Sequence, residues 1–586
     1  MRRENVPSLV SLCINAVKIE LLRGSDDLFP DVFELPTELF NPLVECLPPL
    51  ALQKLQSKTN ANFNEAWNTL FNIRWHDFED CGCDQPVDWQ QIYWETHVQD
   101  CLDEAADIAC LPSFSGCLGD IPILESVQLY IGYMDDMGNS DCLKLSYQCQ
   151  QFGCYVRCFT LQNVLCVLES CQLLRNSNLQ RLVVQKISHF QVVDVLRNLL
   201  YQNRRTLTSL QFEGCEISSS FMDAICGSFC MSGAETHQIQ HFSISFSNFY
   251  EMDPVYLGDS LASFLSSGRS LQWLKLRDNH RNASSNVTSL ELSTDNIAGW
   301  LSNFNWRSGV AKSLQSLRIL NLGGNNLQKE DAGQLKYALV QMPSLEILDL
   351  SGNPIGDEGI RSLIPYFAQA SKSGSPLTDL KLENCKLSSD GMTQLLDALS
   401  TSTRPMTYLS LADNNARSQL AEALGKFWAT SIQGLNLECM GLCKPGFRKL
   451  EDIITDNLNL VELNISNNYG GIETAKFLSK LIVHAPRLVS VDASYNFMPE
   501  ESLPLICSAL RTAQGHLEKV YLDWNLWMYK PSHDAILAEF QHNGKPILVI
   551  PDRPDDDDDD DDAAIDDDVG DIDDDDDIDI DDAGDD

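Results

Sequence analysis

The 586-residue sequence contains no apolar run of the length, about 18 residues or more, that a membrane-spanning helix needs. Its N-terminus, MRRENVPSL, also lacks the apolar stretch and the A-x-A cleavage site of a secretory signal. We therefore expect no membrane span and a location in the nucleus, the cytoplasm or both. In those compartments the 20 cysteines would be reduced, and most would serve as small core residues.

Basic residues are scarce. The chain has 42 Lys and Arg against 84 Asp and Glu, which gives a net charge of −42. Nucleic-acid binders concentrate cations against phosphate, so direct binding to nucleic acid is not expected. The last 35 residues, Asp552–Asp586, hold 23 Asp and one Arg and carry −22 of that charge. We expect this tail to be disordered, and either to solubilise the protein or to hold basic partners such as histones.

Motifs for catalysis and metal binding are also missing. The sequence has no phosphate-binding G-x4-G-K-[ST] loop, no G-x-S-x-G and no H-E-x-x-H. Cys81 and Cys83 have Cys101 and Cys110 downstream, but C-x-C without a second close pair is a poor frame for zinc. We expect a non-catalytic binding protein with no metal and no cofactor.

What the sequence does have is a repeat, L-x-x-L-x-L-x-x-N/C, as in "LRILNLGGN" and "LEILDLSGN". Its eight regular copies begin at Leu317, Leu345, Leu377, Met406, Ile432, Leu460, Leu488 and Leu517. Looser copies begin at Leu179, Leu207, Ile239 and Leu271, and "LESVQL" at Leu124 is a candidate first copy.

Each copy predicts a short strand followed by a helix. The residues at positions 4 and 6 point inward along the strand, and the Asn or Cys at position 9 can bond backbone groups where the strand ends. The second halves, such as "KEDAGQLKYALVQM", place apolar residues at helical intervals. The pattern resembles the leucine-rich repeat family, in its ribonuclease-inhibitor-like subclass. That resemblance implies an α/β horseshoe solenoid with parallel strands inside and helices outside.

The strand face of such a horseshoe is predicted to bind protein. Its outward column between the second and third leucines supplies the candidate substrate-binding residues, which are Asn321, Asp349, Lys381, Asn436, Asn464, Asp492 and Tyr521. A solvated strand surface is the alternative. The 46 residues from Leu271 to Leu317 break the rhythm, and they predict either a degenerate repeat at Leu290 or a loop standing off the solenoid.

The segment "SLVSLCINAV" predicts a short helix that begins near Pro7. Its apolar side is a single stripe made of Leu9, Leu12, Cys13, Ala16 and Val17. The stripe could pack on the protein's own N-terminal region. The spacing of Ser8-Leu9, Cys13 and Val17 also resembles the elongin-binding BC box, which implies that Leu9, Leu12, Cys13 and Val17 contact elongin C.

A second element follows at the distance expected from that family. "LPTELFNPL" places Leu35, Pro36, Leu39 and Leu43 as in a cullin-binding box, with Leu39 and Leu43 on one helical face. The same segment and "DWQQIYWETH" also resemble an F-box, which binds a Skp-type adaptor. Either resemblance implies a cullin-RING ubiquitin ligase substrate receptor, whose partners are elongin B/C or a Skp-type adaptor, and a cullin.

Two other functions remain open. A Ran GTPase activator also joins such repeats to an acidic tail, with Arg204 and Arg205 the nearest candidates for its arginine. A histone-binding repeat protein is the third reading. We predict a helical adaptor-binding region at 1–110, a solenoid at 120–545 and a poly-Asp tail at 552–586.

Overall fold

The computed structural model describes residues 9–550 except for the following positions: 24–31, 60, 76–86, 110, 134–139, 163–168, 188–192, 231–236, 250–260, 262–263, 266–267, 269, 279–313, 374–375, 402–405, 429, 455–457, 514 and 526–530. The predicted tail and the Cys81–Cys83 pair lie outside the described residues. Among the helices that are described, none combines the length and apolar character needed to cross a membrane.

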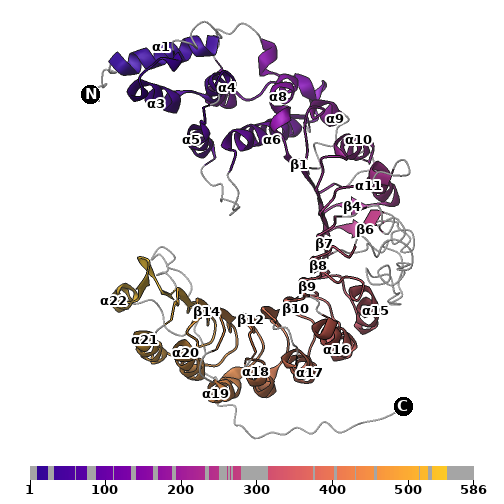
Figure 1. The fold of residues 1–586 in the computed structure, drawn as a ribbon, viewed down its shortest axis with the longest axis vertical. Helices are drawn as coiled ribbons and strands as arrows, with labels where there is room; N and C mark the ends of the chain where they lie inside the picture. The colour runs from indigo at the N-terminus through magenta and orange to yellow at the C-terminus, as the bar shows by residue number, and fades with distance from the viewer. Residues whose placement is uncertain are drawn as a thin grey trace.

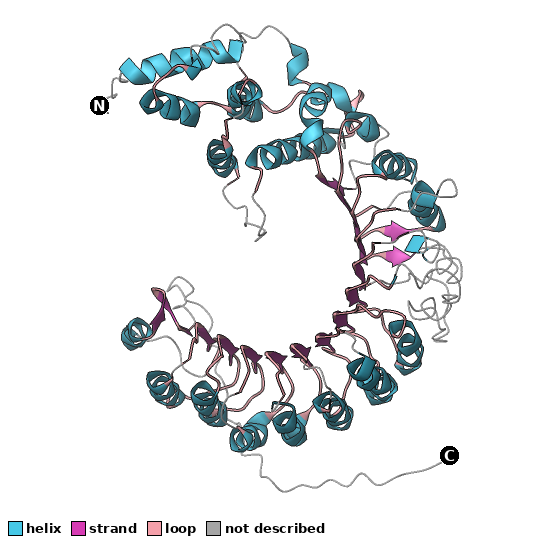
Figure 2. Ribbon diagram, viewed as in Figure 1, coloured by secondary structure: helices cyan, strands magenta, loops and turns pink. Residues whose placement is uncertain are grey.

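A 14-stranded parallel sheet runs through most of the chain and lines the inner side of a horseshoe (Figures 1 and 2). In spatial order its strands are β1 (Cys158–Gln162), β2 (Arg181–Gln185), β3 (Ser209–Glu213), β5 (His241–Ser245), β7 (Trp273–Arg277), β8 (Ile319–Asn321), β9 (Ile347–Asp349), β10 (Asp379–Lys381), β11 (Tyr408–Ser410), β12 (Gly434–Asn436), β13 (Glu462–Asn464), β14 (Ser490–Asp492), β15 (Lys519–Tyr521) and β18 (Leu548–Val549). This confirms the predicted solenoid.

Helices cover the outer side of the arc (Figure 2). Those following the strands are α10 (Val193–Asn203), α11 (Ser219–Cys230), α15 (Lys329–Leu339), α16 (Gly356–Ser373), α17 (Ser389–Ser400), α18 (Ala421–Trp428), α19 (Cys443–Ile453), α20 (Ile472–His484), α21 (Ser502–Thr512) and α22 (Pro531–Glu539). α15 begins with a capping box between Gln328 and Asp331, and the Ser388 hydroxyl accepts a hydrogen bond from the Asp390 N–H at the start of α17. Leucines from strands and helices form one continuous core between the two layers.

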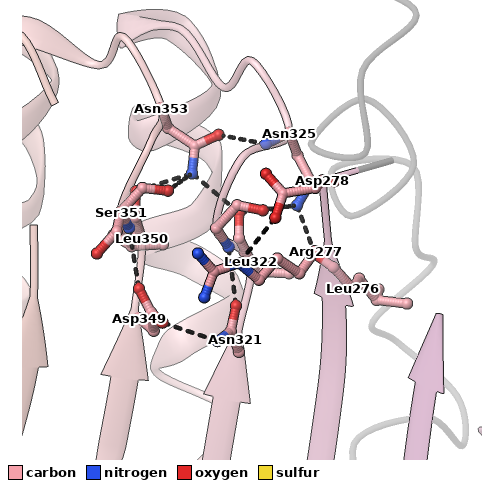
Figure 3. A network of polar contacts seen from close by, with 11 residues as sticks. Leu276, Arg277, Asp278, Asn321, Leu322, Asn325, Asp349, Leu350, Ser351 and Asn353 are labelled. Carbon is pink, nitrogen blue, oxygen red and sulfur yellow. Dashed lines mark hydrogen bonds and ion pairs between the residues drawn. The ribbon is translucent and has the colours of Figure 1, made fainter. Parts of the chain in front are cut away.

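The asparagine at position 9 bonds the backbone where each strand ends (Figure 3). Asn353 is fully buried, and its Nδ2 donates to the carbonyl oxygens of Leu322 at 2.9 Å and Leu350 at 2.8 Å. Its Oδ1 accepts from the N–H groups of Asn325 and Leu327 at 2.9 and 3.0 Å. Each asparagine thus ties its own repeat to the previous one, as predicted from the repeat pattern.

The ends of the solenoid differ from the prediction. The proposed first repeat at Leu124 is wrong, because Glu125–Ile131 is a helix, α7. The first strand is β1, in the segment "VRCFTLQ", whose apolar residues were overlooked because its position 1 is Val156 rather than leucine. At the other end the sheet extends past residue 545 to β18, which pairs with β15.

The strands on the two sides of the long interval before Leu317 are neighbours in the sheet. β7 pairs directly with β8, with Trp273 opposite Ile319 and Leu274 opposite Leu320. Both predictions for this interval, a degenerate repeat at Leu290 and a loop standing off the solenoid, fall on residues 279–313, which lie outside the described part of the chain.

The N-terminal region is helical, as predicted, and occupies one end of the arc (Figure 1). It comprises α1 (Leu9–Arg23), α3 (Thr37–Cys46), α4 (Pro49–Ser57), α5 (Asn64–Arg74), α6 (Trp89–Ala109), α7 and α8 (Leu145–Phe152). α6 joins this region to the solenoid by covering the edge strand β1. Glu95 Oε2 accepts the N–H groups of Arg157 and Cys158 at 2.6 Å, and Gln99 bonds both backbone groups of Thr160.

Cysteine burial is mixed. Of the 15 cysteines that the structure describes, six are buried and six are exposed. The expectation that most of them fill the core is therefore wrong.

Candidate functional site

α1 presents two unlike faces. Ile14, Val17 and Leu21 pack against the protein's own core, and Leu21 is fully buried. On the other side Leu12 is 51% exposed and Cys13 is exposed. The predicted single stripe is therefore divided, because Val17 is partly buried and helps to anchor the helix, and its assignment to the adaptor surface stays a prediction. The side chain of Leu9 lies outside the described residues.

α3 divides the predicted cullin box in the same way. Pro36 stands at its N-cap as expected, and Leu39 in the first turns is 41% exposed. Leu43 is only 2% exposed and Leu35 packs partly on the core. The prediction that Leu39 and Leu43 share one partner-facing side is wrong, because Leu43 fills the interior. Leu39 and Pro36 are the members of the box that reach solvent.

The Trp–Tyr helix resembling the one after an F-box is α6. Its aromatic residues Tyr93 and Trp94 are buried. Trp94 stacks on Phe152 with ring centroids 3.7 Å apart, and its Nε1 donates to Gln53 Oε1 at 2.8 Å. These side chains connect α4, α6 and α8, so this helix holds the N-terminal region together rather than offering a surface.

The predicted substrate column is continuous in space. Parallel register aligns Asn321 with Asp349, Asp349 with Lys381, Asn436 with Asn464, and Asp492 with Tyr521. Six of the seven predicted residues are half-buried on the concave side of the sheet.

Asp349 is the exception in that column. It is buried, accepts from Asn321 Nδ2 at 2.7 Å and from the Ser351 N–H at 3.0 Å (Figure 3). Its place on the substrate-binding face is therefore corrected, because its carboxylate already serves the neighbouring repeat. The buried carboxylate of Asp349 still adds negative charge near the concave face.

Carboxylates crowd the concave face of the C-terminal half. Burial raises the pKa of Glu438, and repulsion from Asp413, Asp492 and Glu383 raises it further, while a hydrogen bond from Asn464 opposes the shift. A group whose ionised form is disfavoured by several neighbouring anions lies in a negative potential. This face would attract a cationic ligand and repel phosphate.

The described residues hold no group suited to a metal ion, and the side chain of Arg204, a candidate arginine of a GTPase activator, packs on Tyr201. Among the described residues no group of three or more His, Cys, Asp or Glu could hold a metal ion. Arg204 lies with its guanidinium 4.1 Å from the centre of the Tyr201 ring and donates to the Tyr201 carbonyl at 2.9 Å. That residue is held against its own helix.

Sequence reasoning missed a set of exposed aromatic side chains in the last repeats, Tyr469, Tyr495, Phe497 and Trp524. They occupy positions 8 and 10 of their repeats, immediately beside the position-9 asparagine. Large aromatic residues next to a conspicuous Asn in consecutive copies were the signal available in the sequence.

Comparisons with known proteins agree with this architecture. The pattern of the Leucine Rich repeat family matches residues 313–334 and 341–363. Pig ribonuclease inhibitor is 30% identical over 187 residues, which is 30% of this chain and 40% of that protein. Mouse NACHT, LRR and PYD domains-containing protein 14 is 26% identical over 35% of this chain and 24% of its own length. The chain thus spans less than half of each of these relatives.

Solved structures with the same kind of fold are more distant. The yeast complex of Rad7 and Elc1 includes a chain that is 15% identical, with a TM-score of 0.41, covering 66% of this chain and 84% of that one. The leucine-rich repeat-containing protein LegL7 from Legionella pneumophila has a TM-score of 0.29 at 20% identity, covering 56% of this chain and 87% of its own. With its 14-stranded parallel sheet and repeated asparagines, this chain has the architecture of a leucine-rich repeat solenoid, and residues 313–334 and 341–363 match the pattern of that family.

Proposed function

We propose that this protein is the substrate-recognition subunit of a cullin-RING ubiquitin ligase and carries no catalytic activity of its own. The observation that carries the proposal is the outward face of α1. Leu12 and Cys13 stand in solvent while the opposite side of the same helix is anchored on α3 and α4. An exposed leucine and cysteine on a firmly held helix suit insertion into a pocket of another protein.

The spacing of Ser8-Leu9, Cys13 and Val17, followed by Leu35-Pro36 and Leu39, favours elongin C as the adaptor and a cullin as the next subunit. Leu43 is buried and Val17 packs partly on the core, and α1 contacts both α3 and α4. Leu9, Leu12, Cys13 and Leu39 are left as the proposed contact residues. The concave sheet would hold the substrate, in the nucleus or the cytoplasm.

Affinity purification tests this role. The full chain is expected to co-purify with elongin B, elongin C and a cullin, and Leu12→Asp with Cys13→Asp is expected to abolish their recovery. Because both side chains are exposed, the double variant should melt at the wild-type temperature. The matched control is Leu129→Asp, which alters a leucine that is 71% exposed on α7, outside both boxes.

The outcomes separate the candidate functions. Recovery of a Skp-type adaptor in place of elongin would replace the elongin assignment with the F-box one. Recovery of no adaptor and no cullin, together with accelerated GTP hydrolysis by Ran, would refute the receptor role and favour the GTPase activator.

A further inference from the structure

Position 8 of the repeat has one backbone conformation throughout the solenoid. In the 12 repeats from Leu179 onward its φ lies between 47 and 69°. The residues are Lys186, Gly214, Phe246, Asp278, Gly324, Gly352, Asn384, Asp413, Cys439, Asn467, Tyr495 and Trp524. This left-handed conformation favours Gly, Asn and Asp, because the Cβ of a bulky side chain comes too close to the backbone there.

The last two repeats place Tyr495 and Trp524 at this position. Their rings stack with centroids 5.8 Å apart and planes 14° apart. Tyr469 and Phe497 occupy position 10 of successive repeats, also with positive φ, and their rings stack with centroids 5.4 Å apart and planes 22° apart. We call these four residues the aromatic patch. Each member is 48–67% exposed.

The aromatic patch borders the acidic part of the concave face. The Tyr495 N–H donates to the Asp523 carbonyl at 3.0 Å, and Trp524 follows Asp523 in the chain. Asp492 lies beside Tyr521 in the register of β14 and β15. At positions 3, 5, 7 and 8 of the four repeats from Ile432 onward, the acidic residues Glu438, Glu462, Asp492 and Asp523 outnumber the single lysine, Lys519, whose Nζ lies 5.8 Å from the centre of the Tyr521 ring.

We propose that the aromatic patch, with Asp492 and Asp523, binds an arginine-rich extended segment of a protein partner. A guanidinium can stack on the faces of Trp524 and Tyr495 and at the same time pair with a carboxylate at the border of the patch. A lysine has a charge but no plane to stack, so arginine fits better. In the receptor role this segment belongs to the substrate, and to that extent the inference rests on the proposed function.

Charge also excludes the protein's own C-terminal segment as the occupant. Asp552–Asp586 carries −22 and would be repelled by a face bordered by Asp492, Asp523 and Glu438. Phosphate groups of a nucleic acid would be repelled in the same way. A cationic partner segment is the chemistry that both the rings and the carboxylates accept.

The test is a fluorescence anisotropy titration of the full-length protein, without any adaptor. The probes are three labelled peptides of equal length in which serine alternates with arginine, lysine or glutamate. The arginine peptide should bind most tightly, the lysine peptide more weakly and the glutamate peptide not at all. Raising the salt concentration should weaken binding of both cationic peptides.

The informative variant is Tyr495→Gly with Trp524→Gly. Glycine accepts a positive φ, so this double variant should melt no lower than the wild type. Loss of both rings should weaken binding of the arginine peptide by about tenfold or more, since a desolvated cation–π contact reaches roughly 2 kcal/mol. The matched control is Phe246→Gly, at the same repeat position and 55% exposed, which should leave the affinity unchanged.

Two results would overturn the proposal. One is an arginine-peptide affinity that is the same in the double variant and the wild type. The other is a wild-type dimer, seen by sedimentation, that the double variant dissolves, which would make the patch a contact between two copies of this chain. Because no adaptor is present, either result leaves the elongin and cullin assignment to its own test.

Discussion

Asn353 shows how a single side chain holds two repeats in register. Its Nδ2 donates to carbonyls of both repeats, its Oδ1 accepts N–H groups of the previous repeat, and it is inaccessible to water. Cys385 occupies the same position one repeat later, where its Sγ donates to Leu350 O at 3.3 Å and Glu383 O at 3.5 Å. Cysteine therefore replaces part of the amide's bonding, since a thiol is a single weak donor.

Asn353→Ala is expected to lower the free energy of unfolding by about 3 kcal/mol or more, because each buried backbone group left unsatisfied costs roughly 1–3 kcal/mol. Asn353→Cys should cost less, as Cys385 indicates. Urea denaturation followed by circular dichroism measures both. Equal losses for alanine and cysteine would contradict this account of position 9.

His97 in α6 is another polar residue that is fully buried. Its Nδ1 lies 3.1 Å from Arg74 Nη1 and its Nε2 lies 3.1 Å from Gln148 Oε1. Burial, with the charge of Arg74, lowers the pKa of His97 from 6.5 to about 3, and the Gln148 bond opposes the shift only in part. The imidazole is therefore neutral in the folded protein near pH 7.

The pKa of His97 is lower in the folded protein than in the unfolded chain, so the unfolded chain takes up a proton first as the pH falls. The contribution of His97 to the free energy of unfolding is therefore complete above pH 6.5. It is lost as the pH falls toward 3, by up to about 1.4 kcal/mol per pH unit. We expect the free energy of unfolding of the N-terminal region to fall more steeply below pH 6.5 in the wild type than in His97→Gln. Parallel pH profiles would show that His97 does not titrate this way.

At the scale of the element, the orientation of α1 is set by three apolar residues spaced about one helical turn apart, Ile14, Val17 and Leu21. Helical spacing allowed two faces through this helix, one with Leu9, Leu12 and Cys13 and one with Ile14, Val17 and Leu21. Packing on α3 and α4 chose the second, since it buries Leu21 completely. Leu12 and Cys13 of the first face were left in solvent, and the proposed function depends on that choice.

Leu21→Ala is expected to destabilise the N-terminal helical region by about 2–4 kcal/mol through loss of buried surface and the cavity left behind. Leu12→Ala should change stability by less than about 0.5 kcal/mol, as at other exposed sites. Thermal unfolding of the two variants gives the comparison. A larger loss for Leu12→Ala would mean that α1 packs with its other face inward.

At the scale of the whole molecule, charge is divided between the arc and the tail. Asp552–Asp586 carries −22 and the remainder of the chain −20. The arc has its own core and sheet, which end with β18 at Val549. The tail follows the arc in the chain, and residues up to 550 form the described core and sheet by themselves.

Deletion of 555–586 is expected to leave the melting temperature unchanged and to weaken binding to histones, with a steep salt dependence in the full chain. Calorimetry and a histone pulldown measure the two effects. The control replaces the tail with an uncharged Gly/Ser segment of equal length. Undiminished histone binding by both variants would reduce the tail to a solubilising role.

The sequence alone determined the solenoid, because the repeat acts through neighbouring copies and needs no long-range information. Leu320, Leu348 and Leu380 point inward in any strand of that pattern, and the position-9 asparagines satisfy local backbone groups. The same reasoning predicted the helices over 329–342 and 389–399. It overlooked β1, whose valine and phenylalanine depart from the leucine pattern.

Tertiary structure decided which apolar residues are available to partners. Val17 and Leu43 fit the partner-binding boxes in sequence, yet Leu43 is buried in the core and Val17 packs partly against it, while Leu12, Cys13 and Leu39 are exposed. Stacking of Tyr495 on Trp524 required the parallel pairing of β14 with β15, which places these two repeats side by side. Periodicity specifies that a helix or strand has an apolar side, but only packing against the other elements determines which side is covered.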